Sequence, residues 1–236
     1  MDIVAHRGYG EAYPENTRFA FTEAAESADW IELDLRTCRT GHVLVFHDET
    51  LDRLTEDTGP LKAKRWSEIQ NLRIEGSSET VLRLEDALSA IPAETGVQLE
   101  LKEYGIADRV RSIVSDYSHS VRYISFSLLV LNEVRTLSPE ESLGFILHPG
   151  VFGENPKLGL DLATHLGCSA VHLYPRMLHD GNTVALAKKR GLDVQAGFDD
   201  RNDEEIVSAL EGYTDLGVDY VSLDKPLQGE AVEVIR

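Results

Sequence analysis

The feature that most constrains this chain is a regular alternation of short apolar runs with longer segments of helical period. Eight runs are rich in apolar and β-branched residues, as buried strands are, and they span residues 2–6, 30–35, 97–102, 121–126, 143–147, 170–173, 192–196 and 220–223. Helical periodicity recurs between most of them, at residues 17–27, 106–117, 128–137, 158–166, 183–190 and 204–216. The alternation predicts an α/β fold, a (β/α)8 TIM barrel.

An open, doubly wound parallel sheet is the competing architecture, because it also alternates strands with helices. The Gly-x-Gly-x-x-Gly fingerprint of dinucleotide-binding sheets does not follow the first expected strand, which disfavours this alternative. The chain has 236 residues, a length at which a barrel commonly forms one domain. We therefore expect a single barrel domain over residues 1–236.

One stretch departs from the alternation, between the second and third expected barrel strands. It begins with a hairpin-like turn at residues 40–42 and a further apolar run at 43–46, and short helical segments follow near residues 67–72 and 84–90. A long insertion at one such connection usually serves function. We expect a small insertion over about residues 40–95.

Net charge excludes one class of partner. The formal charge is −18, whereas proteins that bind nucleic acid present a basic surface. The sixteen arginines outnumber the seven lysines, and an acid-rich, lysine-poor composition is typical of proteins from salt-loving organisms, where molar salt screens self-repulsion. An ordinary acidic cytosolic protein is the alternative.

The apolar runs and the cysteines indicate a compartment. No run reaches the length of about 18 residues that a membrane-spanning helix needs, so we expect no stable membrane insertion. The opening MDIVAHRG lacks the basic region and the longer apolar run of a signal peptide. Cys38 and Cys168 lie far apart without metal-binding spacing, which is typical of reduced intracellular thiols. We expect a cytoplasmic protein, and its oligomeric state stays open.

Acidic side chains alternate along two neighbouring expected strands. Residues two apart on a strand share a face, so Glu32 and Asp34 point together into the barrel, and Glu100 and Lys102 repeat the pattern on the next strand. Three converging carboxylates repel one another and need a cation or hydrogen bonds. Exposed or ion-paired carboxylates are the alternative. Oxygen ligands favour hard ions, so the pattern predicts Mg²⁺ or Ca²⁺ at Glu32, Asp34 and Glu100.

Two histidines end apolar runs beside charged neighbours. His6 ends the first expected strand and precedes Arg7, and His47 ends the apolar run of the insertion and precedes Asp48. Imidazole can act as acid or base near neutral pH. Arg7 and Lys102 add fixed positive charge. With a divalent ion, these groups predict cleavage of an anionic phosphate ester, because cations neutralise the phosphoryl oxygens while the histidines move protons.

The motifs that hold these residues resemble those of the glycerophosphodiester phosphodiesterase family. In chain order, the matching motifs are His6-Arg7-Gly8, Pro14-Glu15-Asn16-Thr17, Glu32-x-Asp34, His47-Asp48, Leu51-Asp52-Arg53-x-Thr55 and Glu100-Leu101-Lys102. The resemblance is densest over the first 102 residues and continues more weakly to the end of the chain.

From the residues themselves, Pro14 and Asn16 end the first loop, and we expect Asn16 to be the N-cap of the following helix.

The resemblance implies a barrel with this insertion and metal-dependent hydrolysis of a small-molecule glycerophosphodiester to an alcohol and glycerol phosphate. It implies a general acid and base at His6 and His47, metal ligands at Glu32, Asp34 and Glu100, and phosphate-binding cations at Arg7 and Lys102. Either histidine remains a candidate for either role. Direct attack by water and attack by a glycerol hydroxyl through a cyclic phosphate both stay open.

Two features lie outside this central set. His172 and Tyr174 follow the sixth barrel strand, where they either face the substrate or form an ordinary polar strand end, and we include His172 among the candidate substrate-binding residues. The family usually has a Trp-Thr-Val-Asn-like segment after strand seven, whereas Ala196 here precedes Gly-Phe-Asp-Asp. We therefore expect the pocket to lack that aromatic wall.

Two alternatives keep the fold and change the function. A lysophospholipase D-like enzyme, or another phosphodiesterase of acylated substrates, needs an apolar rim or membrane-binding loop, whereas residues 52–80 of the insertion are mostly polar and charged. A non-catalytic phosphodiester-binding barrel would usually lack a histidine or a metal-binding carboxylate, and the chain retains them all.

Overall fold

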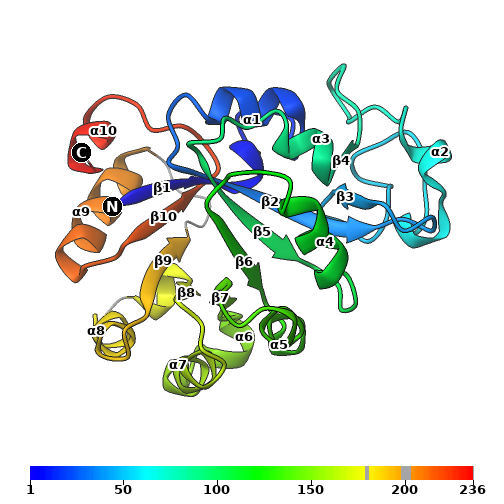
Figure 1. The fold of residues 1–236 in the computed structure, drawn as a ribbon. Coiled ribbons are helices and arrows are strands. Elements are labelled where there is room, and N and C mark those ends of the chain that lie inside the picture. The colour runs from blue at the N-terminus through cyan, green and yellow to red at the C-terminus, as the bar shows by residue number, and fades with distance from the viewer. Residues whose placement is uncertain (179–180, 198–202, 236) are drawn as a thin grey trace.

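The computed structural model describes residues 1–178, 181–197 and 203–235, and eight parallel strands form its centre (Figure 1). The strands are β1 Asp2–Ala5, β2 Trp30–Thr37, β5 Gly96–Leu101, β6 Val121–Ser125, β7 Ser142–Ile146, β8 Ala170–Leu173, β9 Asp193–Gly197 and β10 Tyr220–Leu223. Each pairs with the next around the sheet, and β1 pairs with both β10 and β2, which closes the barrel. The TIM-barrel prediction is confirmed.

Helices surround the strands on the outside of the barrel (Figure 1). They are α1 Arg18–Ala24, α3 Leu84–Leu88, α4 Ala107–Val114, α5 Leu128–Leu137, α6 Pro149–Phe152, α7 Pro156–His165, α8 Asn182–Lys189, α9 Asp203–Leu216 and α10 Glu230–Ile235. Short 3-10 turns lie at η1 His6–Gly8 and η3 Pro175–Met177. Among the described residues, no helix combines the length and apolarity that crossing a bilayer would require.

Barrel strands such as β5 carry apolar side chains on their outer face and polar side chains on their inner face. On β5, Val97 and Leu99 belong to the main apolar core beneath the helices. The alternate residues Gln98 and Glu100 are buried too, and Glu100 lines a pocket at the end of the barrel. Inside the barrel, the Gln98 amide donates a hydrogen bond to Gln195 Oε1 at 2.7 Å. The period of two therefore separates an apolar outer layer from a polar interior.

The insertion forms a small lobe on one side of the barrel (Figure 1). Strand β3 Val43–Val45 pairs antiparallel with β2, and β4 Leu82–Arg83 pairs antiparallel with β3. The lobe also holds η2 Leu61–Ala63 and α2 Trp66–Ile69. It has its own apolar cluster, which includes Phe46, Leu51, Leu61 and Ile69. Helix α3, which follows β4, instead packs into the main core.

Gly96 at the start of β5 leaves room for the indole of Trp30, since a Cβ at residue 96 would overlap the indole ring carbons. We expect Gly96→Ala to lower the free energy of unfolding by about 1–3 kcal/mol, because the ring must move in a packed region. Urea denaturation followed by tryptophan fluorescence measures this change.

Gly212 in α9 is the matched control, because a Cβ there meets no atom within 4 Å. Gly212→Ala should raise the free energy of unfolding by about 0.5–1 kcal/mol, since alanine loses less backbone entropy in a helix. Equal shifts in the two variants would show that the Trp30 contact is not what constrains residue 96.

Candidate functional site

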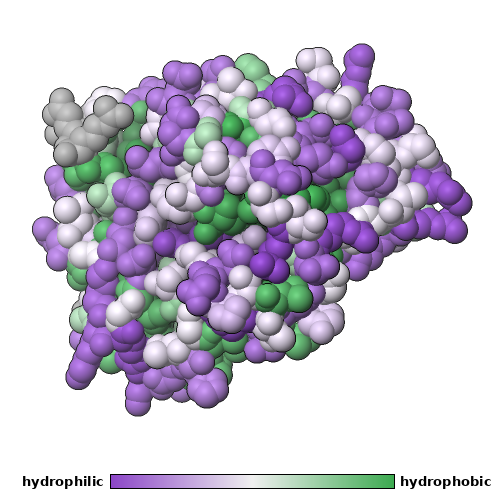
Figure 2. All heavy atoms as spheres, in the orientation of Figure 1, coloured by the Kyte–Doolittle hydropathy of each residue, from purple (hydrophilic) through white to green (hydrophobic). Residues whose placement is uncertain are grey.

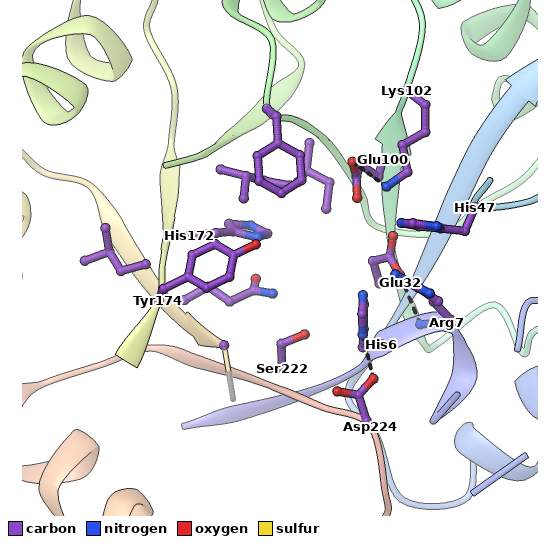
Figure 3. Close-up of a pocket in the computed structure, with 16 residues that line it drawn as sticks. His6, Arg7, Glu32, His47, Glu100, Lys102, His172, Tyr174, Ser222 and Asp224 are labelled. Carbon is purple, nitrogen blue, oxygen red and sulfur yellow. Dashed lines mark hydrogen bonds and ion pairs between the residues drawn. The ribbon is translucent and has the colours of Figure 1, made fainter. Parts of the chain in front are cut away.

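A pocket of about 230 Å³ opens at the carboxyl ends of the barrel strands. It is lined by seven of the eight site residues predicted from the sequence: His6, Arg7, Glu32, His47, Glu100, Lys102 and His172. The eighth, Asp34, is fully buried and pairs with Arg7 and Lys102. Figure 3 shows His6, Glu32, His47 and Glu100 close together, with His172 and Tyr174 across the pocket.

The three predicted metal ligands form one buried cluster. Glu32 and Asp34 come from β2, and Asp34 lies directly opposite Glu100 on β5. One carboxylate oxygen from each residue lies within 4.8 Å of those of the other two. Burial and the negative charge of Asp34 raise the pKa of Glu32 to about 8, and burial raises the pKa of Glu100.

The donor set of this cluster fits a hard divalent cation. Three carboxylates from two rigid strands offer oxygen ligands at one point, which suits Mg²⁺ or Ca²⁺. Glu32 Oε1 is buried and accepts no hydrogen bond from any described residue. Because an unsatisfied buried carboxylate oxygen is costly, this atom supports the assignment of a cation to the cluster.

Two basic side chains compensate part of the negative charge. The ammonium of Lys102 lies 2.8 Å from Asp34 Oδ1 and 2.7 Å from Glu100 Oε1. Arg7 Nε lies 3.2 Å from Asp34 Oδ2, and the Arg7 backbone N–H donates to Glu32 Oε2 at 3.0 Å. Burial alone would raise the pKa of Asp34, but Lys102 and Arg7 hold it well below the usual range of a carboxyl.

The loop after β1 places Arg7 by an uncommon backbone conformation. Arg7 and Asn16 both have positive φ, 53° and 58°. Gly8 also has positive φ, and a Cβ there would lie 2.9 Å from Ala20 Cβ, so the loop passes against α1 only with glycine. Positive φ at residues other than glycine is rare and clusters at functional sites.

The predicted role of Asn16 as a helix cap is wrong. Thr17 caps α1, since its hydroxyl accepts a hydrogen bond from the N–H of Ala20. The buried Asn16 amide instead donates to Asp34 Oδ2 at 2.9 Å. The two residues are neighbours, and both are good caps. Only the path of the loop decides that Asn16 turns toward the acidic cluster.

Each of the two pocket histidines pairs with a carboxylate. His6 Nδ1 lies 2.6 Å from Asp224 Oδ1, and His47 Nδ1 lies 2.6 Å from Asp48 Oδ1. Such a pairing orients an imidazole ring and favours the tautomer with the proton on Nδ1. The sequence motifs did not predict Asp224 as a partner of His6. Its position directly after the last apolar strand could have indicated a residue at the pocket.

The surroundings of the two histidines push their pKa values apart. Burial lowers the pKa of His6, but the hydrogen bond to Asp224 and the charge of Glu32 outweigh it and raise the pKa to about 9. Burial lowers the pKa of His47, and the positive charges of Lys102 and Arg7 add to this effect. Opposite shifts in one pocket are typical of an acid and a base.

Arg53 in the insertion links both sides of this arrangement. It donates two hydrogen bonds to Asp48, from Nε at 2.7 Å and from Nη2 at 3.0 Å. It donates two more to Glu15, from Nη1 and Nη2, both at 2.8 Å. Glu15 in turn accepts from Arg7 Nη1 at 3.2 Å. Arg53 thus connects Asp48, the partner of His47, to Glu15, the partner of Arg7. The sequence motifs, taken separately, did not predict this connection.

The opposite wall of the pocket is mostly apolar. Ile124, Phe126, Ile146 and Leu173, from β6 to β8 and the residue after β6, line it. His172 is one of the polar residues on this side: its Nε2 is buried without a hydrogen-bond partner in the described part of the chain. Burial and the charge of Arg122 lower its pKa to about 3, so His172 is neutral.

His172 and Tyr174 both line the pocket, and contact with a substrate remains a prediction for them. Gly197, at the end of β9, also lines the pocket. The expected lack of an aromatic wall concerns residues 198–200, which lie outside the described residues.

Comparisons with known proteins identify relatives of the whole chain. The chain matches the glycerophosphoryl diester phosphodiesterase family over residues 6–228. A glycerophosphodiester phosphodiesterase of Caldanaerobacter subterraneus subsp. tengcongensis is 31% identical over 164 residues, 63% of this chain and 68% of the relative. YhdW of Bacillus subtilis is 29% identical over 243 aligned positions, which cover 96% of this chain and 95% of the relative.

Solved structures share the whole fold. The glycerophosphodiester phosphodiesterase of Agrobacterium tumefaciens superposes with a TM-score of 0.84 at 27% identity, and the match covers 100% of both chains. A phosphodiesterase of Oleispira antarctica, solved with the product sn-glycerol-3-phosphate, has the same fold, with a TM-score of 0.82 at 24% identity over 100% of this chain and 96% of that one.

The acidic cluster predicts one site for a divalent ion. Calorimetric titration of chelator-treated protein with Mg²⁺ or Ca²⁺ should show a single binding event. Glu100→Gln should weaken the affinity at least about tenfold, because it removes an anionic ligand. Glu49→Gln is the control, since its side chain is 84% exposed. Equal affinities of the two variants would exclude Glu100 as a ligand.

Proposed function

The chain belongs to the glycerophosphoryl diester phosphodiesterase family and is a phosphoric diester hydrolase, and we propose that it hydrolyses glycerophosphodiesters to an alcohol and glycerol phosphate with a divalent metal ion. One observation carries this proposal: a buried carboxylate cluster lies in the same pocket as two carboxylate-paired imidazoles. These are the parts that metal-assisted phosphodiester cleavage needs.

Glu32, Asp34 and Glu100 hold the metal in this proposal. When bound, the ion neutralises charge on the phosphoryl oxygens and acts as a Lewis acid. Arg7 and Lys102 line the pocket beside the cluster, where they orient the phosphate and stabilise the charge that develops on it. Together with the bound metal ion, these two cations would give the pocket a local field opposed to the net charge of −18, which would otherwise repel an anionic substrate.

The two histidines divide the proton transfers. His47, with a lowered pKa, is neutral near pH 7 and accepts the proton of the nucleophile, which is water or a hydroxyl of the glycerol. His6, with a raised pKa, is protonated and donates its proton to the leaving alcohol oxygen. Asp48 and Asp224 orient the rings, and the neutral imidazole of His172 forms part of the substrate-facing wall on the opposite side.

A cytoplasmic location belongs to the same proposal. Cys38 and Cys168 are both buried and free. They lie in different apolar clusters: Cys38 packs in the cluster of the insertion lobe, and Cys168 packs in the main core. Thiols kept apart in this way are typical of proteins from reducing compartments.

Hydrolysis of glycerophosphocholine, followed by glycerol phosphate release, tests the proposed reaction. A chelator should abolish activity and added divalent metal should restore it. His47→Gln and His6→Gln should each lower kcat about 10²- to 10⁴-fold, because each removes one proton transfer. His165→Gln, at the exposed end of α7, should leave kcat unchanged. Tight binding of the substrate without turnover would instead support the non-catalytic alternative.

The dependence of kcat/KM on pH tests the assignment of acid and base. Activity should fall at low pH, where His47 gains a proton, and at high pH, where His6 loses the proton that it holds up to about pH 9. Asp224→Asn removes the carboxylate that raises the pKa of His6, so the alkaline limb should move to lower pH while the acidic limb stays in place. A shift of the acidic limb alone would reverse the assignment.

A further inference from the structure

Arg53 belongs to a motif of the insertion, Leu51-Asp52-Arg53-x-Thr55, from which no residue lines the pocket. The motif forms a tight turn, because the N–H groups of Leu54 and Thr55 both donate to the carbonyl of Leu51, at 3.3 and 3.1 Å. The Thr55 hydroxyl donates to the same carbonyl at 3.1 Å, and Leu51 is fully buried. The turn is therefore anchored in the lobe, and it presents Arg53 at the surface.

The insertion lobe and the loop after β1 pack into different apolar clusters. Leu51 and Leu54 belong to the cluster of the insertion, whereas Tyr9 of the loop belongs to the main core. Figure 2 shows mostly hydrophilic side chains over the lobe, at the right of the view. Because the two segments are anchored in separate clusters, polar contacts across their boundary help to determine how the lobe lies against the loop.

This boundary places one carboxylate on each of two edges of the Arg53 guanidinium. Asp48 of the lobe accepts from Nε and Nη2, at 2.7 and 3.0 Å. Glu15 of the loop accepts from Nη1 and Nη2, both at 2.8 Å. Both pairings are bidentate, and the planar guanidinium provides this geometry whereas the ammonium of lysine does not. The contact therefore depends on the shape of the arginine head as well as on its charge.

Each of the two carboxylates also contacts a residue of the pocket. Asp48 Oδ1 lies 2.6 Å from His47 Nδ1, and Glu15 Oε1 accepts from Arg7 Nη1 at 3.2 Å. The hydrogen bonds from Arg53 lower the pKa of Asp48 to about 2, so this carboxylate is ionised and accepts the Nδ1 proton of His47. Figure 3 shows His47 and Arg7 on the same side of the pocket. A displacement of one carboxylate from the other would therefore move His47 relative to Arg7.

Building on the proposed function, we propose that Arg53 is a positioning residue for phosphodiester cleavage. By joining the carboxylate partners of the two groups, it sets where the base His47 lies relative to the phosphate that Arg7 orients. Arg53 does not line the pocket, so it acts through these partners and not on the substrate. The base must meet the nucleophile in line with the phosphorus, and a displacement of about 1 Å can lower the rate about 10²-fold.

Hydrolysis of glycerophosphocholine by Arg53→Lys separates the geometry of residue 53 from its charge. Lysine keeps the positive charge but cannot form two bidentate pairings. We expect kcat and kcat/KM to fall together by about 10- to 100-fold with KM unchanged, because positioning is lost and substrate contact is not. The affinity for Mg²⁺ in calorimetric titration should stay unchanged, since the three carboxylates of the metal cluster are intact.

Arg53→Ala allows a chemical rescue, because the side chain that it removes is 47% exposed and leaves an opening to solvent. A guanidinium ion from solution can then pair with both carboxylates. We expect millimolar guanidinium chloride to raise the kcat of this variant at least about fivefold, and sodium chloride at the same concentration to have no such effect. No recovery, or equal recovery with sodium chloride, would show that the loss does not come from the missing guanidinium.

Arg83 provides the matched control, since it is also an arginine of the insertion that pairs with two carboxylates. It lies 3.0 Å from Glu85 and 2.9 Å from Asp86, and none of the three residues lines the pocket. Arg83→Lys and Arg83→Ala should leave kcat unchanged. Exposed ion pairs contribute little to stability, so we expect all these variants to fold, and circular dichroism with thermal unfolding checks this.

A double-variant comparison tests the connection from its other side. Glu15→Gln leaves the pairing of Arg53 with Asp48 in place and breaks the pairing with the loop. The loss of kcat in the double variant Glu15→Gln, Arg53→Lys should be smaller than the product of the two single losses, because both changes break the same connection. A loss equal to that product would show that the two residues act independently.

Three further results would overturn the assignment of Arg53. One is an unchanged kcat in Arg53→Lys, and another is an equal loss of kcat in the Arg83 variants. A third is a rise of KM at unchanged kcat, since this would make Arg53 a substrate-binding residue. Each of these results requires that the unaltered protein hydrolyses glycerophosphocholine. An unaltered protein that releases no glycerol phosphate would instead contradict the proposed function and, with it, the role of Arg53.

Discussion

The burial of three carboxylates inside one barrel is the constraint on which the rest of the site depends. Glu32, Asp34 and Glu100 occupy inward positions of β2 and β5, where water cannot solvate them freely. Such a cluster is tolerable only with positive charge and hydrogen-bond donors directly beside it. Arg7 and Lys102 supply the charge. A metal ion would complete the compensation at Glu32 Oε1, which has no hydrogen-bond partner among the described residues.

The same cluster sets the protonation of its neighbours. The hydrogen bond to Asp224 and the charge that Glu32 carries when ionised outweigh burial and raise the pKa of His6, whereas burial and the cations beside Asp34 lower the pKa of His47. The acidic cluster and its counter-ions thus differentiate two histidines that look alike in sequence. Arg53 holds the insertion against the first loop, because its four hydrogen bonds join Asp48 of the insertion to Glu15 of that loop.

The pocket is asymmetric because the barrel strands contribute unlike residues. The strands on the β1, β2 and β5 side bring charge, and the strands from β6 to β8 bring mostly aliphatic and aromatic side chains. An enzyme for phosphodiesters needs the charged half for the reaction. The apolar half takes no part in neutralising the phosphate, so it is the part of the pocket able to select among substituents on that phosphate.

The barrel follows from the order of apolar runs and helical segments along the chain, because their spacing encodes which faces are buried. The sequence also placed Glu32, Asp34 and Glu100 on shared faces, since side chains alternate strictly along a strand. Contacts across loops depend instead on how the folded chain packs: Asp224 lies beside His6, Asn16 turns from the helix cap toward Asp34, and Arg53 lies between two carboxylates. These contacts join residues 18 to 218 positions apart. Local periodicity does not predict contacts between residues so far apart in sequence, because the path of each loop depends on the packing of the whole barrel.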